Sequence, residues 1–194
     1  MGFILVGIGE ILWDLLPAGK QLGGAPANFA YHAHSLGQTG IAVSRVGRGD
    51  LGREIVARLD ALGLGAEFIT LDEHRPTGTV SVRLDAAGVP DFTIYTDVAW
   101  DALTGTPEIL ALAPRVDAVC FGSLAQRSLV SRQAVQSFLR TCPGDAFTTV
   151  LAVGMLPMLV YKANTKWRPF QAVSQHPCVF QYGGVGHRCY SFGV

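Results

Sequence analysis

Two short stretches near the start of the chain carry groups suited to binding a polyol. Asp14 follows an apolar run over 3–8, and ligands of open α/β sheets lie beyond the carboxyl ends of the strands, where a carboxylate can accept hydrogen bonds from hydroxyl groups. In Gly23-Gly24-Ala25-Pro26-Ala27-Asn28, the glycines let the backbone approach a ligand, and Asn28 offers both a donor and an acceptor. Taken singly, Asp14 also fits a solvated loop acid, and the glycine pair fits an ordinary loop before a helix.

Two further glycine-rich turns have different expected roles. Gly47-Arg48-Gly49-Asp50-Leu51-Gly52 contains Asp50, which we expect to cap the following helix. Gly144-Asp145-Ala146-Phe147 is expected to open an apolar helix, whose first backbone N–H groups would favour an anion. The carboxylate of Asp145 could then take a proton from a nearby hydroxyl. An Asp in a first helical turn is also common without any function, so this stretch alone decides little.

Alternating strand and helix patterns supply a scaffold for these residues. Strands are expected over 3–8, 41–46, 66–71 and 116–121, and helices over 26–36, 50–62 and 131–140. Residues 77–96 show two alternating strand patterns around a turn, which predicts a β-hairpin. The chain is therefore expected to be an α/β protein with a mostly parallel sheet, flanking helices and a projecting hairpin.

The expected hairpin is more apolar than a lone two-stranded ribbon tolerates. Its apolar residues are Val80, Val82, Phe92, Ile94 and Tyr95. Because such ribbons are marginal alone, we expect this one to pack on the ligand cleft or on a partner chain, which would give a homodimer.

The composition suits a buried core and excludes several classes of protein. Of the 194 residues, 49% are hydrophobic and 15% charged, which argues against a disordered or coiled-coil chain. Lys plus Arg and Asp plus Glu each number 15, and this zero net charge gives no electrostatic footprint for nucleic acid or anionic membranes. The four cysteines form no CxxC pair, and neither apolar stretch, at 1–16 or 146–161, has the pattern of a leader or a membrane span. We therefore expect a cytoplasmic protein with no nucleic-acid or membrane partner.

Several segments together resemble one known family. GEILWD, GGAPANFAYHAHSLG and VGRGDLG, at these spacings, strongly resemble the first half of a ribokinase/PfkB-type carbohydrate kinase. The hairpin followed by TDVAWDAL resembles the lid region of the fructokinase branch, and GDAFTTVLAVGML resembles the family's second signature. The resemblance implies a ribokinase-like fold and phosphorylation of a sugar's primary hydroxyl, with ATP and Mg²⁺ as cofactors and fructose as the expected sugar.

The same resemblance implies roles for individual residues. The sugar-binding residues would be Asp14, Gly23, Gly24 and Asn28. Asp145 would be the catalytic base, and the backbone of Gly144 would contribute to an anion hole that stabilises the transferred phosphoryl group.

Two departures from the family pattern affect the catalytic end. Cys142-Pro143 stands where the family has glycine-alanine, and proline removes a backbone N–H that an anion hole would use. The βα units that the family carries before its second signature are essentially absent after Arg140. The expected organisation is thus an incomplete kinase, with the N-terminal part of the domain over 1–140, a remnant of the catalytic helix over 141–156 and an irregular tail over 157–194. A frameshifted or misassembled C-terminus would explain both departures, and a genuine tail stays open.

Alternative functions stay open on the sequence alone. An active sugar kinase predicts ATP turnover stimulated by a hexose, whereas an inactive sugar-binding fragment predicts binding without turnover. A dinucleotide-binding enzyme is disfavoured because GIGEIL, at 7–12, lacks the final glycine of GxGxxG. The spacing of His176, Cys178, His187 and Cys189 is unlike a zinc pattern, so no metal ligand is assigned.

Overall fold

The main sheet has five strands, all parallel. The computed structural model describes residues 2–84, 90–144, 146–151, 179–180 and 189–190. The strand order is β5-β4-β1-β8-β9. The strands are β1 (Ile4–Ile8), β4 (Thr39–Gly47), β5 (Ile69–Asp72), β8 (Ala118–Gly122) and β9 (Phe147–Leu151).

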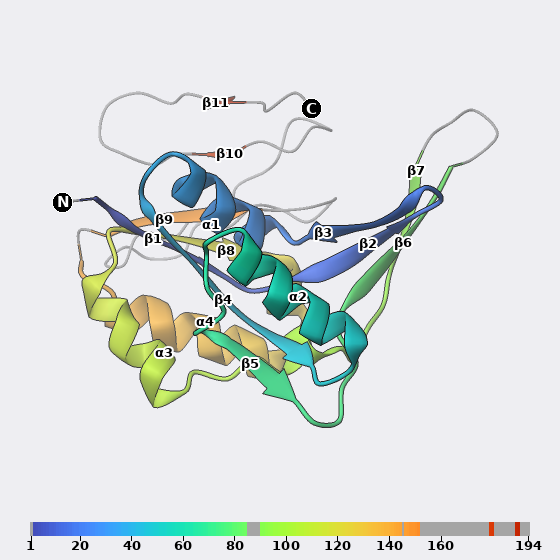
Figure 1. Ribbon diagram of the computed structural model, residues 1–194. Coiled ribbons are helices and arrows are strands. Elements are labelled where there is room, and N and C mark those ends of the chain that lie inside the picture. Colours follow the sequence, from blue (N-terminus) through green and yellow to red (C-terminus); the bar gives the residue numbers. More distant parts are fainter. Residues whose placement is uncertain (1, 85–89, 145, 152–178, 181–188, 191–194) are drawn as a thin grey trace.

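Helices cover both faces of this sheet (Figure 1). One face carries α1 (Ala25–Ser35) and α2 (Asp50–Ala61), and the other carries α3 (Pro107–Leu112) and α4 (Leu129–Thr141). Alternate strand residues reach the two layers: Ile8 and Val43 pack with Phe138 of α4, whereas Val46 packs with Ile55 of α2. Three short 3₁₀ helices, η1 (Ala99–Ala102), η2 (Ala113–Arg115) and η3 (Leu124–Arg127), join these elements. The predicted α/β class with a parallel, helix-covered sheet is confirmed.

A second sheet of four strands, here called the projecting sheet, extends from one end of the first (Figure 1). Its order is β3-β2-β6-β7, with β2 (Leu12–Leu16), β3 (Gly19–Gly23), β6 (Thr79–Leu84) and β7 (Pro90–Ile94). β6 and β7 form the hairpin predicted over 77–96. It is not a lone ribbon, however, because β2 pairs with β6, with Trp13 opposite Thr79, and β3 pairs with β2.

The helix expected to open at Gly144 is not formed. Phe147–Leu151 is strand β9, which lies parallel to β8 with Phe147 opposite Ala118. Its sequence, FTTVL, is rich in aromatic and β-branched residues, which favour strands. The chain passes from β8 through α4 directly into β9, which is an ordinary crossover connection between parallel strands. The alternation of strand and helix therefore continues past Arg140 as far as β9. The helix predicted after Gly144 is therefore wrong over 147–151, and the division of the chain at 141–156 stays a prediction.

The cap predicted for α2 is also wrong. Gly49 occupies the N-cap position and Asp50 is the first residue of the helix, where its carboxylate pairs with the guanidinium of Arg53. An acidic group in the first turn is still favourable to the helix dipole.

Little of the predicted tail can be compared with the structure. Within 157–194 the described residues are the paired two-residue strands β10 (Val179–Phe180) and β11 (Cys189–Tyr190). His176, Cys178 and His187 lie outside the described residues. No helix in the described part of the chain has the length and apolar character needed to cross a membrane.

Candidate functional site

Asp14 lies on β2, just beyond the carboxyl end of β1, and its carboxylate rests against the backbone of β3. A Cβ atom added to Gly23 would lie 2.2 Å from Asp14 Oδ2, so only glycine leaves room for the carboxylate in this position. The side chain of Asp14 is half-buried, and this loss of solvent raises the pKa of its carboxyl group. Asp14 and Gly23 are thus in direct contact, as a shared site requires.

Gly24 brings the start of α1 against the chain that leaves β1. Its φ of 111° is a backbone conformation that favours glycine, and an added Cβ would lie 2.4 Å from the carbonyl oxygen of Glu10. α1 begins at the next residue, and the Asn28 N–H donates to the carbonyl oxygen of Gly24 at 2.9 Å. The side chain of Asn28 is exposed. The four residues predicted to bind sugar are therefore all at the carboxyl end of β1, around one turn.

Glu10 is a member of this region that the sequence analysis did not select. It directly follows the turn at Gly9 after β1, only 2% of it is exposed, and its Oε2 accepts no hydrogen bond from the described residues. A Cβ at Gly122 would lie 1.9 Å from Oε2, so the carboxyl group packs on the last residue of β8. Burial raises its pKa to about 7, although backbone groups of Glu10 and Ala125 and the charge of Arg127 act in the opposite direction. The sequence signal that selected Asp14, an acidic residue just after an apolar strand, applies equally to Glu10.

Gly144 lies at the other edge of the sheet. It precedes β9, whose first residue is level with Ala118 at the amino end of β8, whereas the residues predicted to bind sugar follow the carboxyl end of β1. A five-residue strand spans roughly 16 Å, so the anion hole predicted at Gly144 is separated from Asp14 by the depth of the sheet. Asp145 lies outside the described residues, and its role as the base stays a prediction.

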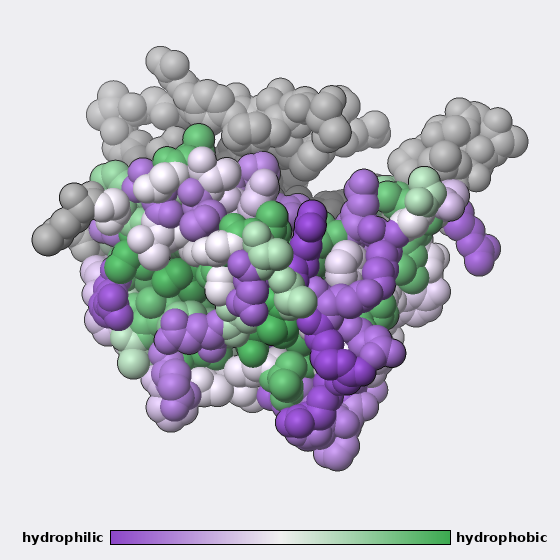
Figure 2. Space-filling view, viewed as in Figure 1, coloured by the Kyte–Doolittle hydropathy of each residue, from purple (hydrophilic) through white to green (hydrophobic). Residues whose placement is uncertain are grey.

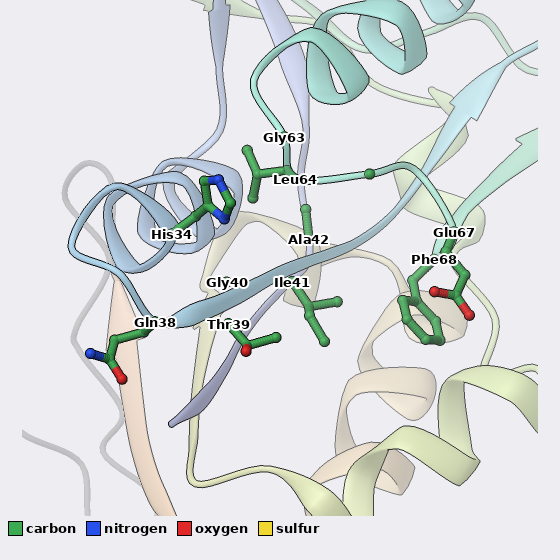
Figure 3. A pocket seen from close by; sticks show the side chains of 11 residues that line it. His34, Gln38, Thr39, Gly40, Ile41, Ala42, Gly63, Leu64, Glu67 and Phe68 are labelled. Carbon is green, nitrogen blue, oxygen red and sulfur yellow. The ribbon is translucent and has the colours of Figure 1, made fainter. Parts of the chain in front are cut away.

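A pocket of about 410 Å³ also lies at the edge opposite the candidate site (Figure 3). It is bounded by His34 at the end of α1, Thr39 at the start of β4, Gly63 after α2, and Glu67 and Phe68 before β5. It contains none of the predicted site residues, so its size alone does not make it the active site.

The charged surface gives no further candidate on the face in view. Figure 2 shows hydrophilic side chains gathered over α2 and beside its amino end, where Lys20 pairs with Glu54 and Arg48 with Glu73. Exposed pairs of this kind contribute little to stability and satisfy one another.

With this fold and site in place, comparison with known proteins identifies the class. The family of PfkB carbohydrate kinases matches residues 18–153, and the chain belongs to this family. The sugar kinase PH1459 of Pyrococcus horikoshii is 29% identical over 154 residues, which cover 74% of this chain and 49% of the relative. A fructokinase of Vibrio alginolyticus is 37% identical over 90 residues, which cover 44% of this chain and 29% of that protein.

Solved structures confirm the predicted ribokinase-like fold. The crystal structure of PH1459 matches with a TM-score of 0.68 over 76% of this chain and 52% of that chain, and PH1459 has also been solved in complex with ATP. A fructokinase from Xylella fastidiosa, with bound ATP, matches with a TM-score of 0.67 at 22% identity over 84% of this chain and 52% of that one, which shows the fold alone. The chain spans about half the length of PH1459.

Proposed function

We propose that this chain forms the sugar-binding half of a PfkB-family kinase, with fructose as the first candidate sugar. The observation that carries the proposal is the contact between the Asp14 carboxylate and Gly23, beside the tight turn at Gly24 that opens α1. Family membership supports a sugar as the ligand, and the fructokinase of Vibrio alginolyticus supports the choice of fructose.

Each residue of the site has a distinct part in holding the sugar. Asp14 accepts hydrogen bonds from sugar hydroxyls, and the carboxylate form is the better acceptor. Gly24 offers backbone with no side chain in the way, and Asn28 donates and accepts from the first turn of α1. The projecting sheet, which carries Asp14 itself, would act as the lid that covers the bound sugar and excludes water.

The cofactors ATP and Mg²⁺ are proposed for a kinase of the relatives' full length. PH1459 has been solved in complex with ATP. Within the described residues, however, no group of three or more His, Cys, Asp or Glu side chains is arranged to hold a metal ion. Mg²⁺ is usually held by one or two carboxylates together with water and substrate phosphates, so no magnesium ligand is assigned among these residues, and the part proposed for them is binding and orientation of the sugar.

Binding without turnover is accordingly favoured over an active kinase. The experiment is a fructose titration of the purified chain by calorimetry, together with a coupled assay of ATP hydrolysis in the presence of fructose and Mg²⁺. We expect saturable fructose binding and no sugar-stimulated turnover. Turnover near one per second, abolished by Asp145→Asn, would establish the active-kinase alternative. Absence of binding by any hexose would contradict the proposed function.

A homodimer through the projecting sheet is a second proposal. Phe92 is 57% exposed and Tyr95 is 46% exposed, both in or beside β7, and aromatic side chains so exposed are typical of contact surfaces. Sedimentation velocity should show a concentration-dependent dimer that Phe92→Ser weakens. A monomer at all concentrations would remove the proposal.

A further inference from the structure

Arg127 has an unusually complete set of partners at the junction of the two sheets. Its Nε donates to Asp101 Oδ1 and its Nη2 to Asp101 Oδ2, both at 2.8 Å. Nη2 also donates to the carbonyl oxygen of Tyr95 at 2.7 Å, and the guanidinium lies 4.1 Å from the centre of the Trp100 ring. Only 25% of the Arg127 side chain and 10% of the Asp101 side chain are exposed, so solvent screens this pair weakly.

These contacts join the projecting sheet to the carboxyl edge of the main sheet. Tyr95 directly follows β7, whereas Arg127 ends η3, the short helix after β8. Trp100 is in turn held from α4, because the Ser131 hydroxyl donates to the Trp100 carbonyl oxygen at 2.6 Å. A second ion pair at this junction, between Arg75 and Asp97, is more exposed, with 42% and 83% of the side chains accessible. Arg127 is therefore the stronger of the two connections.

The projecting sheet is also the sheet that presents Asp14. β7 pairs with β6, with Ile94 opposite Val80, and β6 pairs with β2, with Val80 opposite Asp14. The residue beside Tyr95 is thus connected to Asp14 by two rungs of backbone hydrogen bonding. Asn28, in contrast, lies on α1, which packs on the main sheet, and Gly24 joins β3 to this helix and meets the carbonyl oxygen of Glu10. The sugar site thus spans the boundary between the projecting sheet and α1, and the orientation of one relative to the other depends in part on the junction.

We propose that Arg127 is a positioning residue of the sugar site, which holds the projecting sheet so that Asp14 faces Gly24 and α1. The inference rests on the proposed sugar-binding function, but its mechanical part, the restraint of one sheet by the other, stands on the contacts alone. The planar guanidinium pairs with both oxygens of the Asp101 carboxylate and also donates to the Tyr95 carbonyl oxygen. A lysine ammonium cannot make the bidentate pair and reach Tyr95 at the same time.

The test compares Arg127→Met and Arg127→Lys with Arg132→Met, a matched control. Arg132 is exposed on α4, and its Nε donates to the carbonyl oxygen of Gln126 in the same corner of the fold. Amide hydrogen exchange is measured separately for β6–β7 and for β1, β4 and β8, and fructose affinity is measured by calorimetry.

For Arg127→Met we expect exchange in β6–β7 to accelerate about tenfold or more, since hydrogen bonds to a charged group are lost, with exchange in β1, β4 and β8 unchanged. Fructose affinity should fall about tenfold, Arg127→Lys should restore part of both effects, and Arg132→Met should change neither. If amide hydrogens of Arg127→Met exchange rapidly in all strands, this variant has lost its fold, and the exchange of Arg127→Lys in β6–β7 is used to test the proposal instead. Parent-like exchange in β6–β7 of the folded variants overturns the proposal. If the parent binds no sugar, the proposed function fails, and the exchange data still test the restraint.

Discussion

Replacement of Glu10 by glutamine should change how the stability of this protein depends on pH. The Glu10 carboxyl group is buried, its Oε2 accepts no hydrogen bond from the described residues, and its pKa is raised from 4.5 to about 7. Between these two values the unfolded chain releases this proton while the folded protein keeps it. The folded state therefore loses stability as the pH rises through this window, and the loss is complete above pH 7.

The size of the effect follows from the two pKa values. A difference of about 2.5 in pKa corresponds to about 3 kcal/mol, of which 2–3 kcal/mol falls between pH 5 and pH 8. Glutamine cannot ionise, so Glu10→Gln removes this dependence. Any constant effect of the amide group cancels when the difference in unfolding free energy between variant and parent is compared at the two pH values.

Urea unfolding of parent and Glu10→Gln at pH 5, 6, 7 and 8 measures this quantity. The advantage of the variant over the parent should grow by 2–3 kcal/mol across the range. Glu67→Gln, at an exposed position before β5, serves as the control and should show no such trend. A difference between Glu10→Gln and parent that stays flat within about 0.5 kcal/mol would refute the claim that burial raises the pKa of this carboxyl group.

Three further substitutions test the geometry of the site. Asn28→Ala should weaken fructose binding by about 1–3 kcal/mol in calorimetry and leave thermal unfolding unchanged; equal affinity would remove Asn28 from the site. Gly23→Ala should displace the Asp14 carboxylate and weaken sugar binding. In a double-mutant cycle with Asp14→Ala, the Gly23→Ala substitution should therefore change the sugar affinity little once Asp14 is already alanine. Additive losses of affinity would argue against the contact. Gly24 and Gly37 both have a positive φ, but a Cβ atom added to Gly24 would clash with backbone, whereas one added to Gly37 meets nothing within 4 Å. Gly24→Ala should therefore lower the free energy of urea unfolding by about 2 kcal/mol more than Gly37→Ala does. Equal losses would contradict the close approach at Gly24.

The sequence was sufficient for elements whose signals are local. β1, α1, β4 and α2 were all predicted within a few residues, because each has a continuous apolar run or a helical apolar face bounded by glycine. The proximity of Asp14 to Gly23 is also a local feature, since the short hairpin of β2 and β3 brings the two residues together. The sugar-binding role of these residues stays a prediction. The family resemblance added roles to residues that local chemistry had already selected.

What the sequence left out depends on distant partners. β2 and β3 lack clean alternation, because both Leu12 and Trp13 are buried on a strand that pairs with β6 from a remote part of the chain. The position of Glu10 after β1 could be read from the sequence, but the burial of its carboxyl group depends on Gly122, which meets it only when β8 lies beside β1. The turn at Gly144 was misassigned for the same reason, because β9 forms where β8 offers an edge to pair with.

The most direct test of a sugar site built on Asp14 is calorimetric titration of fructose into the parent chain, Asp14→Asn and Asp60→Asn. Asp60 is exposed on α2, away from the turn at Gly24, and provides the matched control. The parent and Asp60→Asn should bind with the same affinity, and Asp14→Asn should bind about tenfold more weakly or worse, because a charged acceptor becomes a neutral amide. Equal fructose affinity for all three proteins, each folded by circular dichroism, would contradict the central claim.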